Sequence, residues 1–251
     1  MMKTLVLVMV LFVFLSGFVL AEVGPADLKE ARKLAAEGKY EEALQKHIWF
    51  HQESKNSPGM GGVRLSFALS AWITLSEKYP PAKTALVNIR DKNEKALLDG
   101  TGGSSNFHEL YAINRYLKEQ DKTYNTFKTL HDKYPEVAKK CFHVARDLLV
   151  EKKEYRVCGK YVTDPIKEYE RFRKFRELNL KMMRENSKHN TPGMRQHTDD
   201  TFIKNACQLI EILIGLKRNS EAEEIRKRAL EYFDHDKIRN AVIDAEQKIN
   251  G

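Results

Sequence analysis

The sequence predicts an all-α protein, and two observations support this. Apolar residues recur at helical spacing along nearly the whole chain after residue 26, as one face of an amphipathic helix requires. Runs of alternating β-branched residues, which half-buried strands need, are missing. Proline and glycine divide the helical pattern into short segments, so we expect a string of helices joined as antiparallel pairs.

The helix boundaries follow from caps and breakers along the chain. Loops rich in Gly, Pro and Ser are expected at 57–62, 99–105 and 189–198, and Pro135 stands where a first helical residue tolerates it. The predicted helices span 25–37, 40 to the loop at 57, 63–78, 82–98, 106–119, 122–133, 135–151, 154–161, 165–185, 200–216, 220–233 and 235–249.

One stretch carries a repeat signature. Residues 31–44, ARKLAAEGKYEEAL, resemble the tetratricopeptide repeat, with Gly38 and Tyr40 at the turn and Ala43 packed against the preceding helix. A small side chain in the second helix lets the first helix approach closely. Four later stretches resemble this one less closely and also place a small residue at the position of Ala43. The five small residues, successively 39, 41, 35 and 64 residues apart, are Ala43, Ala82, Thr123, Cys158 and Ala222.

The resemblance implies a short right-handed α-solenoid of stacked helical hairpins over most of the chain after residue 21. It also implies an interaction scaffold, because such arrays hold peptide or protein segments in a groove. We expect one tetratricopeptide-like domain over 22–251, with a possible sub-division near the glycine-rich loop at 99–105.

The N-terminus has the layout of a secretory signal. Lys3 precedes an apolar run over 5–15, and small or modest side chains up to Ala21 offer a cleavage site. The run is shorter than the roughly 20 residues that cross a bilayer, so we expect no permanent membrane span after cleavage. Residues 1–21 are therefore predicted to be a signal peptide, and the protein to be exported to the periplasm or secreted.

The charge balance is moderately basic. Removal of residues 1–21 takes away one lysine and no acidic residue, which leaves a net charge of +7. Acidic residues are interleaved with the basic ones, as on a solvated helix surface. This pattern and the export signal argue against a nucleic-acid partner.

The cysteines are Cys141, Cys158 and Cys207, an odd number for a chain predicted to enter an oxidising compartment. We expect them to be small buried residues. The sequence leaves open whether any of them forms a disulfide.

His47 and His51 lie one helical turn apart, a spacing that could place two imidazoles on a metal ion or haem. Ile48 stands where a zinc peptidase has its glutamate base, and no third ligand is close in sequence. We therefore favour packed histidines and keep a metal or haem site as the alternative. Trp49 and Trp72 each belong to an apolar stripe and are predicted to be core residues.

The segment Arg171-Phe172-Arg173-Lys174-Phe175-Arg176 alternates cations with aromatic rings, a composition that can bind a polyanion. On a helix, Phe172 and Phe175 are expected to lie together and turn inward, with Leu178 and Met182 on the same face. The cations then cover a solvated face beside several glutamates. A site for an acidic ligand at Arg171, Arg173, Lys174 and Arg176 is the alternative.

No motif for catalysis or for a cofactor is present. The sequence contains no serine nucleophile elbow, and neither early glycine-rich loop is followed by the Gly-Lys-Ser/Thr of a phosphate-binding loop. We expect no enzyme and no cofactor, but an exported scaffold that binds a protein or peptide partner in the cell envelope or outside. The alternatives are a binder of acidic polymers through the basic helix, and a metal- or haem-handling protein or enzyme using His47 and His51.

Overall fold

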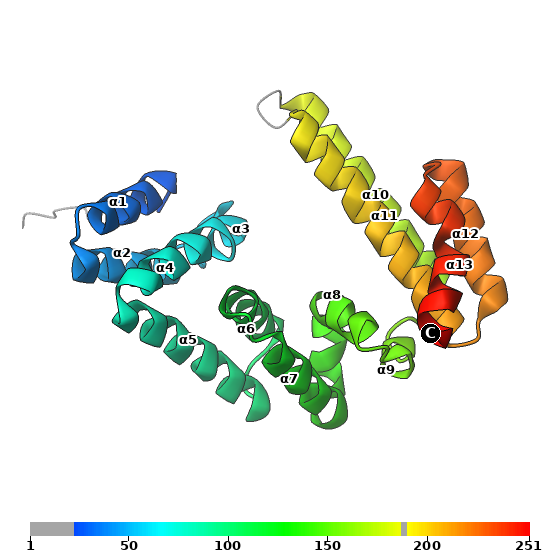
Figure 1. The fold of residues 1–251 in the computed structure, drawn as a ribbon, viewed down its shortest axis with the longest axis horizontal. Coiled ribbons are helices and arrows are strands. Elements are labelled where there is room, and N and C mark those ends of the chain that lie inside the picture. Colours follow the sequence, from blue (N-terminus) through cyan, green and yellow to red (C-terminus); the bar gives the residue numbers. More distant parts are fainter. Residues whose placement is uncertain (1–22, 187–189) are drawn as a thin grey trace, which may run out of the picture. The chain divides into compact units, whose positions relative to one another are not determined.

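The computed structural model describes residues 23–186 and 190–251 (Figure 1). Across these residues the regular structure is entirely helical, which confirms the predicted all-α class. The predicted signal peptide, residues 1–21, lies outside them. None of the helices in this part of the chain is both long and apolar enough to span a bilayer.

The chain divides into two compact units, one ending at Tyr79 and the other beginning at Pro80. The glycine-rich loop at 99–105 lies inside the second unit.

The first unit consists of α1 (Pro25–Ala36), α2 (Tyr40–Glu53), α3 (Met60–Arg64) and α4 (Phe67–Lys78). α1 and α2 pack as an antiparallel pair, and α2 also contacts α4. At the end of the unit, the Tyr79 ring stacks on Tyr40 with centroids 6.1 Å apart. The Tyr79 hydroxyl donates to Glu41 Oε2 at 2.7 Å, so the end of α4 is held to the start of α2.

The second unit contains the remaining helices: α5 (Pro80–Leu98), α6 (Ser104–Leu117), α7 (Gln120–Lys133), α8 (Pro135–Glu151), α9 (Tyr155–Gly159), α10 (Pro165–Glu185), α11 (Pro192–Gly215), α12 (Asn219–Tyr232) and α13 (Asp236–Asn250). α11 packs against α10, α12 and α13. Its second half is apolar on several sides, and Leu209, Ile210, Ile212 and Leu213 are all buried.

One turn recurs in four helix pairs. Its first residue is left-handed, with a positive φ of 79° at Gly38, 60° at Lys118, 57° at Lys153 and 60° at Lys217. In each case the next amide donates to a carbonyl five residues earlier, at 2.8 to 3.0 Å, which closes a Schellman-type C-cap. The next helix begins two residues after the left-handed one.

Four of the five predicted small positions follow this turn. Ala43, Thr123, Cys158 and Ala222 each lie five residues after the left-handed residue, and each is 0% exposed. Ala82 is also 0% exposed, but it follows a different turn, in which Tyr79 is extended at φ −134°. The four equivalent residues are therefore all small and fully enclosed, and they follow the same turn geometry.

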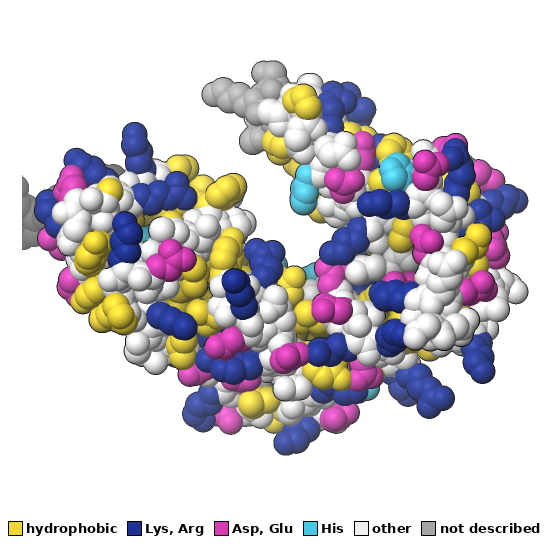
Figure 2. All heavy atoms as spheres, in the orientation of Figure 1, with side chains coloured by type: hydrophobic (Ala, Val, Ile, Leu, Met, Phe, Trp, Pro, Cys, Tyr) yellow, Lys and Arg dark blue, Asp and Glu magenta, His cyan; other side chains and the backbone are white. Residues whose placement is uncertain are grey.

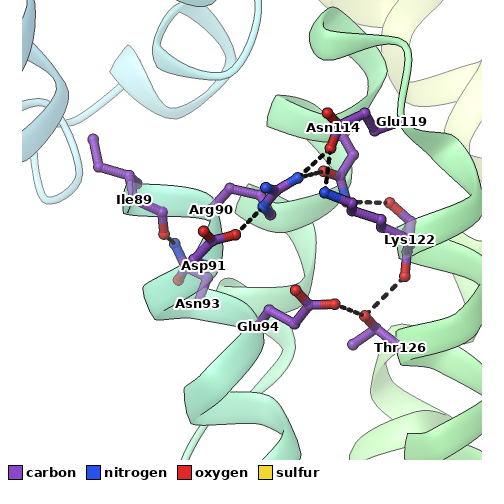
Figure 3. A network of polar contacts seen from close by, with 10 residues as sticks. Ile89, Arg90, Asp91, Asn93, Glu94, Asn114, Glu119, Lys122 and Thr126 are labelled. Atoms are coloured by element: carbon purple, nitrogen blue, oxygen red, sulfur yellow. Dashed lines mark hydrogen bonds and ion pairs between the residues drawn. The ribbon is translucent and has the colours of Figure 1, made fainter. Parts of the chain in front are cut away.

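A polar network explains why one of these small residues is a threonine. Arg90 of α5, only 3% exposed, donates to Asn114 Oδ1 at 3.0 Å and also contacts Asp91 and Glu119 (Figure 3). The Asn114 amide then donates to the Thr123 hydroxyl at 3.0 Å. The network joins α5, α6 and α7 and gives a buried guanidinium its hydrogen-bond acceptors.

Two predicted helix boundaries were wrong. The helix expected over 63–78 is interrupted, because α3 ends at Arg64 and α4 starts only at Phe67. The helix expected from residue 200 starts at Pro192, inside the predicted loop. The Thr191 hydroxyl accepts a hydrogen bond from the Met194 amide at 3.2 Å, so Pro192 opens this helix and does not break the helical pattern.

The three cysteines are free thiols. Cys141 and Cys158 are buried as expected, and burial raises the pKa of each to about 12. Cys207 is only partly buried, and desolvation raises its pKa to about 11.

The left-handed turn at Gly38 gives a testable prediction. A Cβ added there would meet no atom within 4 Å, so Gly38→Ala should destabilise the first unit by backbone strain alone, about 1 kcal/mol. Both tryptophans lie in this unit, so urea unfolding followed by tryptophan fluorescence measures its stability. The control is Gly62→Ala, in the helical α3 and also in open space, which should be neutral or slightly stabilising. Equal losses in both variants would contradict the role of the turn.

Candidate functional site

The two predicted histidines lie on α2 and are both buried, His47 at 2% and His51 at 3% exposure. Both contact the Trp72 ring: His47 stacks on it at 5.6 Å and His51 meets its edge at 5.8 Å. Arg64 reaches across from α3, donating from Nε to the His51 carbonyl at 2.7 Å and lying 2.9 Å from His51 Nε2. His51 is therefore part of the packing between α2 and α3.

A metal centre gains no support from this geometry. Within residues 23–186 and 190–251, no group of three or more His, Cys, Asp or Glu residues is placed to hold a metal ion. Each imidazole also has a cation close by, Arg64 beside His51 and Arg32 near His47, and positive neighbours oppose a metal ion.

His47 also borders a cleft in the first unit. The cleft has a volume of about 240 Å³ and is formed by α1, α2 and α4, with eight lining residues: Arg32, Ala35, Ala36, His47, Ala71, Thr74, Leu75 and Lys78. Small and apolar side chains make up half of its wall. Arg32 and Lys78 are exposed, and neither forms an ion pair within the described part of the chain. The cleft therefore offers an apolar surface with two available positive charges.

The imidazole of His47 is neutral at physiological pH. Burial, reinforced by the nearby Arg32 guanidinium, lowers its pKa from the ordinary 6.5 to about 4. Its Nδ1 atom is sealed from solvent without a hydrogen-bond partner. Nε2 has no hydrogen bond within the described residues either, and His47 lines the cleft, so its imidazole is an unused hydrogen-bonding group in the cleft wall.

The sequence patterns point to only one residue of this cleft, His47. Arg32 and Lys78 belong to different helices, α1 and α4, and nothing in the sequence links them. The local signal was the run of small residues at Ala35 and Ala36, which leaves room beside a helix instead of filling it.

The predicted basic site on α10 is mostly engaged within the protein. Arg171 pairs with Glu168 at 3.0 Å, and Arg173 pairs with Glu170 at 2.9 Å. Arg176 pairs with Asp199 at 2.8 Å and lies 4.3 Å from the Phe233 ring centroid. Lys174 is exposed and forms no ion pair within the described residues. Figure 2 shows the same interleaving elsewhere, with acidic side chains among the basic ones.

The inward orientation expected for Phe175 is wrong. Phe172 is buried at 7% exposure, with the Arg146 guanidinium 4.9 Å from its ring centroid. Phe175 and Leu178 are each 55% exposed, and Met182 is 47% exposed. α10 carries two neighbouring apolar stripes, and the packing buries only the one that contains Phe172.

The predicted core role fits Trp72, which is 1% exposed. Trp49 is half-buried, and the ammonium of Lys46 lies 4.4 Å from its ring centroid.

Comparisons with protein-family models, with curated proteins and with solved structures find no match to this chain.

The lowered pKa of His47 predicts how stability depends on pH. Between about pH 6.5 and 4 the unfolded chain binds a proton at this residue that the folded chain does not, so stability falls as the pH drops through this window. The full loss is about 3 kcal/mol. Urea unfolding at a series of pH values, followed by tryptophan fluorescence, should show this slope, and His47→Gln should flatten it.

The matched control for that experiment is His197→Gln, which alters an exposed histidine of α11 and should keep the slope. A slope that is the same with and without His47 would show that this imidazole is not held neutral by burial.

Proposed function

We propose that the protein is an exported, non-enzymatic helical repeat scaffold of the tetratricopeptide-like kind, which binds a segment of a partner protein in the cleft of its first unit. Support for the repeat architecture comes from the four equivalent turns and the fully buried small residue that follows each of them. Support for export is the signal-like composition of residues 1–21.

The observation that carries the binding proposal is the cleft between α1 and α4. Its alanines and Leu75 suit an apolar side chain of the partner. Arg32 and Lys78 suit an aspartate or glutamate next to that side chain, because neither cation is neutralised within the described residues. His47 Nε2 adds a hydrogen-bonding atom that the fold leaves unused.

The two other hypotheses draw less support. An acidic-polymer site on α10 would need Arg171, Arg173 and Arg176, whose guanidinium groups already contact Glu168, Glu170 and Asp199. A metal or haem site at His47 and His51 would need further ligands, which the described residues do not place nearby.

Selection from a library of random short peptides tests the proposed binding. The enriched peptides should share an apolar residue adjacent to Asp or Glu. The double variant Arg32→Glu/Lys78→Glu should weaken their binding by at least about tenfold, because attraction becomes repulsion at the cleft. Thr74→Trp, at an exposed wall position, should weaken binding by filling the cleft. Fluorescence anisotropy of a labelled peptide measures both effects.

The charge-matched control is Lys29→Glu/Lys55→Glu, two exposed lysines of the same unit that do not line the cleft. This variant should bind like the unaltered chain. A library without enrichment, or peptides whose affinity is the same for the cleft and control variants, would refute the proposal.

A further inference from the structure

The exposed apolar residues of α10 follow a regular pattern. Phe175, Leu178 and Met182 all have about half of their surface exposed and are separated by three and four residues. At 100° per residue they lie within an arc of about 60° on the helix. Arg171 continues the pattern toward the N-terminus, four residues before Phe175. This alternation of three and four is the a/d spacing of a helix that packs along a second helix.

The neighbouring apolar stripe of α10 is already occupied. Tyr169, Phe172 and Met183 are buried on it, and α10 runs beside α11, as Figure 1 shows. A helix that packs on one neighbour has no need of a second apolar stripe. We call Phe175, Leu178 and Met182 the α10 seam.

A row of lysines borders the α10 seam. Lys167, Lys174 and Lys181 are seven residues apart, so they lie in line along one edge of the helix, and all three are exposed. Lys167 and Lys174 form no ion pair within the described residues, while Lys181 lies 3.8 Å from Glu185. Lys174 and Lys181 directly precede Phe175 and Met182, and Lys167 precedes position 168, which continues the same spacing. In a coiled coil this is the g position, whose charge selects the partner helix.

We propose that the α10 seam is a docking face for one amphipathic helix of a partner protein, with apolar residues along its contact line and acidic residues along the edge that meets the lysines. The seam supplies the buried contact, and the lysine row supplies the charge selection. This surface belongs to the second unit, so it is separate from the cleft of the first.

A second copy of the same chain fits this face poorly. Antiparallel pairing of two α10 helices would set one lysine row against the other, because g positions face g positions in that orientation. Parallel pairing would place Arg171 against its own copy at a seam position. Like charges that face each other are destabilising, so a partner with acidic flanks is favoured.

A membrane surface also fits less well. Helices that lie on membranes have a broad apolar face, whereas the α10 seam covers only about 60°. Glu177 and Glu185 are exposed on the same helix and would be repelled by anionic lipid.

A designed peptide serves as the probe. It is a helix of the length of α10, with leucine at positions a and d and glutamate at e and g, and its twin carries lysine at e and g. Fluorescence anisotropy with the full chain should show binding of the glutamate peptide only. The triple variant Phe175→Ser/Leu178→Ser/Met182→Ser should weaken this binding by at least about tenfold. Lys167→Glu/Lys174→Glu/Lys181→Glu should reverse the preference to the lysine peptide.

The control is Lys83→Glu/Lys92→Glu/Lys227→Glu, which makes the same change in net charge at exposed lysines of α5 and α12. It should bind the glutamate peptide like the unaltered chain. All of these substitutions are at exposed positions, and circular dichroism checks that helicity is retained.

Five results would overturn the proposal. The first is no binding of the glutamate peptide, the second is equal binding of both peptides, and the third is binding that survives the serine variant. The fourth is a dimer of the chain in sedimentation that the serine variant abolishes. The fifth is seam-dependent binding to phosphatidylglycerol vesicles that exceeds binding to the peptide. Arg32→Glu/Lys78→Glu should leave peptide binding at the seam unchanged, so failure here and failure of the cleft proposal are distinguishable.

Discussion

Close approach of paired helices is the constraint on which the fold depends. Two helices joined by a short turn can approach closely only where the side chain between them is small. The chain places Ala, Thr, Cys or Ala at that point in four pairs, each time five residues after a left-handed turn residue. A similar limit applies where α11 meets α9, since a Cβ on Gly215 would come within 2.4 Å of the Tyr155 ring.

Much of the fold could be predicted because helical periodicity and small-residue spacing are local signals. The echoes of the repeat signature predict Ala43, Ala82, Thr123, Cys158 and Ala222 as equivalent small positions. All five are fully enclosed, but Ala82 follows a different turn. The break before α4 could not be predicted in this way. It coincides with Arg64, whose guanidinium reaches His51, a contact thirteen residues away in sequence. The start of α11 was missed because Pro192-Gly193 is typical of a loop as well as of a helix start.

In the candidate sites, too, features that depend on contacts between distant helices could not be predicted from the sequence. His47 was noticed for its spacing to His51, yet its importance in the structure comes from Arg32 and Lys78, which only the packing of α1 and α4 brings to one cleft. The hydrophobic periodicity of α10 predicts an inward orientation for Phe175, but periodicity shows only which residues share a helix face. Whether a neighbouring element covers that face depends on the position of α11, which lies on the Phe172 side.

Arginine and lysine have different roles in this chain. Arg64, Arg90 and Arg146 are almost completely buried, and their planar guanidinium groups contact carbonyls, carboxylates or amides from other helices. Many lysines remain at the surface, including the row beside the α10 seam. These three arginines hold helices together, whereas the lysines of the row beside the α10 seam remain at the surface as flexible ammonium groups.

Side-chain volume determines which residue type fits at position 158. Cys158 occupies the place that alanine takes in two of the other three pairs, and its sulfur is wholly enclosed between helices. A thiol there acts as a slightly larger alanine, and its chemistry is inaccessible to oxidants and to other thiols while the fold is intact. Enclosure thus protects this thiol from oxidation without a disulfide bond, and the same holds for Cys141, which is also 0% exposed.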